Sequence, residues 1–136
     1  MKVTISRQGH FNAAHRLYNA HWSQAENDKV FKKCAYPNYH GHNYEVIVSV
    51  TGEIEPQTGF VMSIESLKEI IRTEVEVPFD HKNFNLDVKE LRSLNPTTEN
   101  IIVVIWKKIR KRIPEHLHLK VTLYETPRNF SEYSGE

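Results

Sequence analysis

The sequence predicts an α+β fold in which two helices lie on one face of a four-stranded antiparallel sheet. Two observations predict this fold. Apolar residues alternate with polar ones near both ends of the chain, which is typical of half-buried strands, and two apolar stripes of helical period lie between them. The 136 residues are 39% hydrophobic and 26% charged, as in ordinary globular proteins, and we expect a single domain over residues 1–136.

Composition narrows the possible partners and location. The formal net charge of +1, from 18 basic and 17 acidic side chains, gives no overall field that favours nucleic acid or anionic lipid. The longest apolar run, residues 101–106, is too short to cross a membrane, and the first residues lack the apolar stretch of a signal peptide. The single cysteine excludes an internal disulfide and favours a reducing compartment. We therefore expect a cytoplasmic protein with neither a nucleic-acid nor a membrane partner.

The first strand is predicted to end at His15. Its apolar residues share the parity of that histidine: Val3, Ile5, Phe11 and Ala13. The alternation is interrupted around Arg7 and Gly9. The polar segment 18–33 that follows is too long for a hairpin turn, and we expect a functional or mobile loop there.

The second strand is predicted over residues 44–51 and is preceded by His40-Gly41-His42. Its apolar residues have the parity of both histidines: Tyr44, Val46, Val48 and Val50. Side chains two apart project to the same side of an extended chain. If the two strands pair antiparallel, His15 joins His40 and His42 at one end of the sheet.

Two helices are predicted in the middle of the chain. Ser63 can N-cap the first, and Pro78 ends it. Its apolar stripe is Ile64, Leu67, Ile70, Ile71 and Val75. The second opens at residues 95–99 with a cap, a proline and an early acid. Its apolar stripe is Ile101, Ile102, Ile105, Ile109 and Ile113. The basic residues near its end are interpreted as a solvated face that complements the helix dipole.

The last two strands are predicted over residues 119–126 and 130–133. Leu119, Val121 and Leu123 share their parity with Glu125, and a carboxylate on an apolar parity needs a partner unless the strand twists to expose it to water. Four strands leave two unpaired sheet edges. Pairing of edges between subunits would close the sheet into a ring, so we expect a homo-oligomer.

The histidines and their neighbours suggest metal chemistry. Three neutral imidazoles from His15, His40 and His42 with an open fourth position describe a catalytic Zn2+, although a histidine pair in a strand is weak evidence alone. Cys34, six residues before His40, is a possible nucleophile or base. Asp80 and His81 are adjacent in the loop between the helices, where a solvated Asx-type turn is the alternative interpretation.

Taken together, these residues resemble the 6-pyruvoyl tetrahydropterin synthase family, which includes the 6-carboxytetrahydropterin synthases. The similar segments run in order through nearly the whole chain: residues 11–17, 33–34, 37–44, 51–54, 59–62, 80–83, 97–100 and 124–126. The resemblance implies the T-fold and a homohexamer of two trimers, with strands closed into β-barrels and active sites at subunit interfaces.

The resemblance also implies roles for individual residues. It implies a zinc-dependent lyase acting on 7,8-dihydroneopterin triphosphate, with zinc on the three histidines. Cys34 would be the catalytic base, and Asp80 with His81 the proton-transferring pair. Glu125 would anchor the pterin through a bidentate grip on its N–H groups. Thr97 and Thr98 would help to line the pterin pocket.

The product is left between two alternatives. Five residues separate Cys34 from His40, a spacing similar to that of the 6-pyruvoyl enzymes, whereas many 6-carboxy enzymes of queuosine biosynthesis have a shorter one. The spacing favours the pyruvoyl product. A non-catalytic zinc or pterin-binding module is the alternative from another class. Such a module would keep the histidines and Glu125 but would not need Cys34, Asp80 and His81 together.

Overall fold

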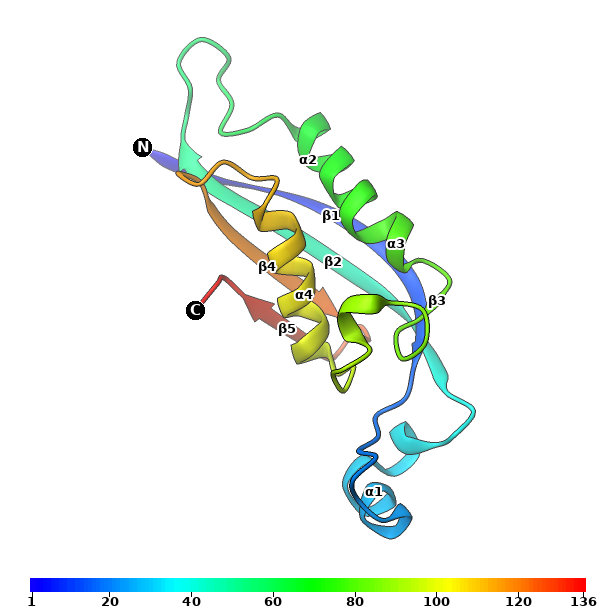
Figure 1. The fold of residues 1–136 in the computed structure, drawn as a ribbon. Helices are drawn as coiled ribbons and strands as arrows, with labels where there is room; N and C mark the ends of the chain where they lie inside the picture. Colours follow the sequence, from blue (N-terminus) through cyan, green and yellow to red (C-terminus); the bar gives the residue numbers. More distant parts are fainter.

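The protein, described by a computed structural model that covers residues 1–136, is an α+β fold built on one twisted sheet (Figure 1). Its strands are β1 (Lys2–His15), β2 (His40–Glu53), β3 (Lys82–Asn83), β4 (His118–Tyr124) and β5 (Phe130–Tyr133). They lie in the order β3-β1-β2-β4-β5. Every neighbouring pair is antiparallel except β1 with β3, which is parallel.

The sheet therefore has five strands and is mixed, where four antiparallel strands were predicted. The additional strand, β3, has two residues that pair with Ala13 and Ala14. A two-residue strand has no alternation to detect in a sequence. It forms because the chain that leaves the helix ending at Phe79 runs back along the edge of β1.

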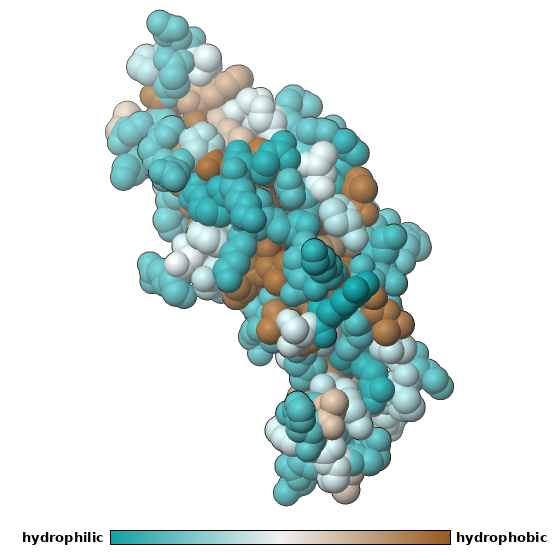
Figure 2. All heavy atoms as spheres, in the orientation of Figure 1, coloured by the Kyte–Doolittle hydropathy of each residue, from teal (hydrophilic) through white to brown (hydrophobic).

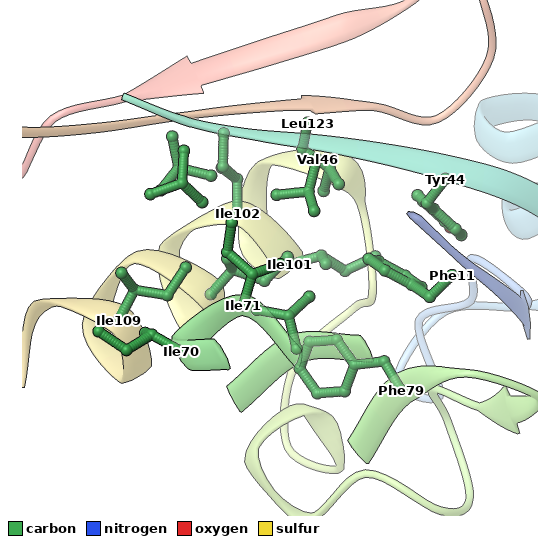
Figure 3. Close-up of a cluster of buried hydrophobic side chains, with 14 of the residues drawn as sticks. Phe11, Tyr44, Val46, Ile70, Ile71, Phe79, Ile101, Ile102, Ile109 and Leu123 are labelled. Carbon is green, nitrogen blue, oxygen red and sulfur yellow. The ribbon is translucent and has the colours of Figure 1, made fainter. Parts of the chain in front are cut away.

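The helices of the middle of the chain cover one face of this sheet, whereas the first helix lies beyond its end (Figure 1). The helical segments are α1 (Gln24–Phe31), η1 (Lys32–Ala35), α2 (Ile64–Ile71), η2 (Arg72–Glu76), α3 (Val77–Phe79), η3 (Lys89–Leu91) and α4 (Thr98–Arg110). The predicted stripes of α2 and α4 are largely buried against β1, β2 and β4, which confirms that the helices lie on one face (Figure 3). None of these helices has the length and apolar character needed to span a membrane.

The first long helical segment runs through α2, η2 and α3 without a break. Ser63 caps it as predicted, because its side chain accepts a hydrogen bond from the Ser66 N–H. Pro78 lacks an N–H donor and crowds the carbonyl four residues earlier. The helix widens to a π-turn just before the proline, where the Val77 N–H bonds the Arg72 carbonyl. It ends at Phe79, one residue beyond the predicted end.

The polar segment after β1 contains a helix and a 3-10 turn, where a loop was predicted. Ser23 caps α1 by accepting a hydrogen bond from the Glu26 N–H. Fully buried Asn27 bonds both the backbone N–H and the carbonyl of Asn19. Local caps and a buried amide thus stabilise α1 without an apolar stripe, so hydrophobic periodicity could not reveal it.

A single core lies between the helices and the sheet, and Figure 3 shows side chains of both layers meeting there. Rings of Phe11, Tyr44, Phe79 and Phe84 pack together at the end of the core that carries the histidines. Gly9 explains the interrupted alternation of β1. A Cβ at this position would lie 2.7 Å from Ile71 Cγ2, so α2 passes too close for any side chain.

The opposite face of the sheet carries no helix and is lined by paired polar side chains. Hydroxyls of Thr4 and Thr51 lie 2.6 Å apart, and those of Ser6 and Ser49 lie 2.8 Å apart. The outer surface on the helical side is also mostly hydrophilic (Figure 2). The uncovered sheet face is therefore polar and internally hydrogen-bonded.

Candidate metal centre and active site

Three histidines meet where β1 ends and β2 begins. His15 pairs directly with His40 in the antiparallel register, and His42 pairs with Ala13. One ligand atom from each histidine lies within 4.8 Å of those of the other two. The predicted convergence is therefore confirmed, and it follows from strand parity and register alone.

The surroundings of His15 orient its ring, and burial affects both His15 and His40. His15 is 1% exposed, and its Nδ1 lies 2.7 Å from the Pro96 carbonyl oxygen. Because a carbonyl only accepts, Nδ1 carries the proton and Nε2 is left as an acceptor. Burial is the largest cause that lowers the pKa of His15, and it lowers that of His40 as well. Neutral imidazole is the form that binds metals.

The unpaired nitrogens fit a metal ion. Five buried side-chain polar atoms of the chain lack a hydrogen-bond partner, and three of them are His15 Nε2, His40 Nδ1 and His42 Nε2. Unpaired buried polar atoms are costly. A cation that accepts one lone pair from each ring satisfies all three. The structure thus supports a metal site made of these histidines.

Glu125 stands directly beside this cluster. Its Oε2 lies 3.8 Å from His15 Nε2 and its Oε1 lies 3.8 Å from His42 Nε2. Thr98 Oγ1 donates a hydrogen bond of 2.9 Å to Oε2. Glu125 shares the parity of the apolar residues of β4, and its carboxylate therefore needed a hydrogen-bond partner, which Thr98 provides. The Glu125 side chain nevertheless stays 21% exposed. Glu125 follows β4 directly, so strand pairing places it at the same end of the sheet as the histidines.

Cys34 lies in the short turn η1 and is half-buried. Burial first, and then the negative charge of Glu125, raise the pKa of the Cys34 thiol. The turn is tied to the end of β1, because the Leu17 N–H donates a hydrogen bond of 2.7 Å to the Cys34 carbonyl. A base at this position needs positive charge nearby to ionise close to neutral pH, and a bound metal cation would supply it.

Asp80 and His81 form a pair at the edge of β1. His81 Nδ1 lies 2.9 Å from Asp80 Oδ2, and Asp80 Oδ1 accepts a hydrogen bond from the Asn12 N–H. The Asn12 bond and then the His81 bond lower the pKa of Asp80. The Asp80 carboxylate thus bonds to β1 and does not form the Asx-type turn that was the alternative interpretation. The His81 side chain is 78% exposed, and no hydrogen bond or ion pair joins the pair to Cys34 or Glu125.

Comparison with known proteins places this arrangement in a family. The profile described as 6-pyruvoyl tetrahydropterin synthase matches residues 4–136. The chain belongs to the 6-pyruvoyl tetrahydropterin synthase family. It is 46% identical over 135 residues to proteins named 6-pyruvoyl tetrahydrobiopterin synthase from Pongo abelii and Homo sapiens, covering 99% of this chain and 93% of each relative.

A solved structure supports the same assignment. The structure of Caenorhabditis elegans 6-pyruvoyl tetrahydropterin synthase is similar with a TM-score of 0.93 at 36% identity, covering 100% of this chain and 97% of that chain. The resemblance inferred from the motifs is therefore confirmed. The fold of this member of the 6-pyruvoyl tetrahydropterin synthase family agrees with that of its relative over the whole length.

Glu125 lines two cavities of the protein. One of about 700 Å³ is lined by Glu125, His42 and Tyr124 on the open sheet face. Another of about 270 Å³ is lined by Glu125 with Thr97 and Thr98. Thr97 also caps α4, because its hydroxyl accepts a hydrogen bond from the helix backbone. Thr97 and Thr98 thus line a cavity next to Glu125, and their contact with a pterin stays a prediction.

Sequence reasoning missed three supporting groups of this synthase-family site. The Pro96 carbonyl orients His15, but a backbone contact from residues far away leaves no local signal. The Tyr44 hydroxyl is fully buried without a partner, and its ring packs against His15 and His42. Parity already placed Tyr44 on the histidine side. Arg16 lies between the metal centre and the Cys34 turn, a position that only the fold reveals.

Proposed function

We propose that the protein is a zinc-dependent 6-pyruvoyl tetrahydropterin synthase. It would convert 7,8-dihydroneopterin triphosphate to 6-pyruvoyl tetrahydropterin with elimination of triphosphate, which makes it a carbon–oxygen lyase. One observation carries the proposal. Three buried or half-buried histidines converge in a chain that matches this family over almost its full length, and the half-buried Cys34 lies in a turn bonded to the residues that follow His15. Zinc is proposed because three imidazoles with an open position are typical of catalytic zinc.

All predicted site residues except Thr97 receive a specific role in this reaction. His15, His40 and His42 would hold the zinc ion, which supplies Lewis acidity toward the hydroxyl-bearing side chain of the substrate. The Cys34 thiolate takes a proton from the first side-chain carbon. His81, oriented by its contact with Asp80, gives and takes protons at the neighbouring carbons. Glu125 accepts two hydrogen bonds from the pterin N–H groups, and Thr98 holds one of its oxygens in place.

The proton and electron balance needs no external oxidant. The second side-chain carbon loses a proton as triphosphate leaves the third with the carbon–oxygen electron pair. The resulting enol becomes a methyl ketone. A second proton shift turns the first hydroxyl into a carbonyl, and the dihydropterin ring takes up the two electrons and becomes the tetrahydropterin.

A homo-oligomer, proposed as a hexamer of two trimers, would complete the site. No strand pairs with Lys2–Asn12 along the outer side of β1, and β5 is the other open edge. Carboxylates of Glu76 and Asp80 occupy the outward N–H groups of His10 and Asn12 on the β1 edge. Because Asp80 and His81 lie exposed at that edge, a neighbouring subunit paired there could receive them beside its own Cys34.

The 6-carboxytetrahydropterin synthase of queuosine biosynthesis is the second candidate, since it would use the same substrate and residue types. The two activities are separated by their products. Purified, zinc-loaded protein incubated with 7,8-dihydroneopterin triphosphate should yield a tetrahydropterin that retains all carbons of the substrate side chain. Mass spectrometry of the product checks this. A carboxy product, formed by loss of a carbon fragment, would show that the protein is instead a 6-carboxytetrahydropterin synthase.

A non-catalytic binding module makes a different prediction in the same assay. It would bind zinc or pterin without turnover, and Cys34→Ala would change nothing measurable. The proposal instead requires triphosphate release by the wild-type protein and its loss in Cys34→Ala with zinc content unchanged. Wild-type protein that holds one zinc ion per chain and releases no triphosphate would overturn the proposal.

A further inference from the structure

The turn that carries Cys34 is attached to the end of β1 by one side chain. Arg16 follows His15 directly, and its Nη2 donates a hydrogen bond of 3.0 Å to the Ala35 carbonyl. Ala35 is completely buried and follows Cys34 in η1. The Arg16 guanidinium also lies over the Tyr18 ring, 4.1 Å from its centroid. A cation–π contact together with a directed hydrogen bond fixes the orientation of the guanidinium.

A backbone contact supports this attachment next to the side chain. The Leu17 N–H donates a hydrogen bond of 2.7 Å to the Cys34 carbonyl. Two successive residues after His15 therefore bind two successive carbonyls of the turn. The histidine that begins the metal centre and the cysteine are thus connected through Arg16 and Leu17, and only the Arg16 contact depends on side-chain identity.

Arg16 is itself held from a third segment. Asn85, in the loop after β3, accepts a hydrogen bond of 2.9 Å from the Arg16 N–H and donates one of 3.0 Å to the Arg16 carbonyl. This pair of bonds fixes the Arg16 backbone outside the regular strand. Figure 1 shows why this matters, since the lobe that carries α1 and η1 projects beyond the end of the sheet. A lobe with little sheet contact needs specific ties to keep a fixed position.

We propose that Arg16 is a positioning residue that holds the Cys34 thiol at a fixed place relative to the three histidines. It acts through the Ala35 carbonyl and does not touch the reacting atoms. The catalytic consequence rests on the function proposed above. The placement of the thiol does not, because it can be measured without turnover.

Thiol labelling tests the placement directly, because Cys34 is the only cysteine of the chain. The rate of Cys34 alkylation by iodoacetamide is measured for wild type, Arg16→Met and Arg16→Lys without added metal. Arg16→Met removes the donor and should speed labelling about ten-fold, the change expected when a charged hydrogen bond no longer restrains local opening. Arg16→Lys keeps a donor without the planar stack and should lie between the two.

Arg110→Met is the matched control. Arg110 also donates to backbone carbonyls, those of Ile113, Pro114 and Leu117, but at the far end of α4. Its loss should lower the unfolding midpoint without changing the labelling rate. Labelling of Arg16→Met within two-fold of wild type would overturn the proposal. Equal acceleration in Arg110→Met would also overturn it, because the effect would then reflect general loosening.

Turnover supplies the second measurement. A displaced thiol should lower kcat for dihydroneopterin triphosphate about ten-fold in Arg16→Met and leave KM nearly unchanged, since the pterin grip by Glu125 is intact. Partial recovery of kcat is expected in Arg16→Lys. A rise in KM at constant kcat would contradict a positioning role. If the wild type itself shows no turnover, the proposed function fails while the labelling result still decides the role of Arg16.

Discussion

His15 and the Asp80–His81 pair are both positioned by β1, but in different ways. His15 is 1% exposed, and its position follows from strand register and from the packed aromatic core beneath it. His81 is 78% exposed at the sheet edge and is held by hydrogen bonds of its turn to Asn12. The histidine cluster is therefore complete within one chain, whereas the Asp80–His81 pair is presented outward. If the proposed oligomer forms, this difference predicts which substitutions act within a chain and which act between chains.

The largest expected effects are losses of activity, and the zinc content of the variants distinguishes the role of the histidines from that of Cys34. His42→Ala should abolish both stoichiometric zinc binding and activity, because two ligands hold zinc poorly. Cys34→Ala should keep the zinc and lose at least about 10²-fold in kcat, as expected for removal of a base. Zinc content by atomic emission, together with initial rates of triphosphate release, measures both. Zinc lost equally from both variants would contradict the division of roles.

A second prediction uses the exposed pair. His81→Ala should lower kcat by about 10²- to 10⁴-fold with unchanged zinc content and thermal stability, because its side chain is exposed and only a proton transfer is removed. Co-refolding Cys34→Ala with His81→Ala should restore part of the activity if neighbouring chains share a site. Inactive mixed oligomers would instead place both groups in the same chain.

Glu125 should show an intermediate effect. Glu125→Gln keeps the shape and the Thr98 contact but replaces one accepting oxygen by a donor. We expect kcat/KM to fall by about 10- to 100-fold, mainly through KM, as a charge-assisted bidentate contact becomes a poorer one. Steady-state kinetics checks this. An unchanged KM for the pterin would argue against Glu125 as its anchor.

The close approach of α2 to β1 predicts a smaller effect, on stability alone. Gly9→Ala places a methyl group 2.7 Å from Ile71 Cγ2, so the helix must shift. Overpacking of this kind costs about 1–3 kcal/mol of unfolding free energy. Urea unfolding followed by circular dichroism measures the cost. Gly59→Ala is a useful contrast, since nothing surrounds a Cβ there and any cost comes from its φ of 76°.

The smallest effect concerns pH. Burial lowers the pKa of His15 and His40 in the folded state, so below the ordinary histidine value of 6.5 the unfolded chain binds more protons than the folded one. Stability of metal-free protein should therefore fall as the pH drops below about 6.5. Urea midpoints from pH 7.5 to 5 measure the slope. His15→Gln should flatten it, whereas an unchanged slope would assign it to other groups.

Particular residues show which parts of the fold and the site could be predicted from the sequence. Strand parity was enough to bring His15, His40 and His42 together, because period and register are regular over long strands. Parity also showed that Glu125 needs a partner, but it did not identify that partner as Thr98. It could not find β3 or α1, since a two-residue strand and a helix stabilised by Asn27 and a Ser23 cap carry no hydrophobic period. Nor could it find Arg16, whose role depends on a turn that is distant in sequence.

X-ray absorption of the zinc-loaded protein tests the central claim most directly. The arrangement of three unpaired imidazole nitrogens, with Cys34 outside the group, predicts a first shell of about three nitrogen ligands at roughly 2.0–2.1 Å and only oxygen besides. In that case the thiol stays free to act as a base. A sulfur scatterer near about 2.3 Å would make Cys34 a fourth ligand and the site a closed, structural one, which would contradict this account.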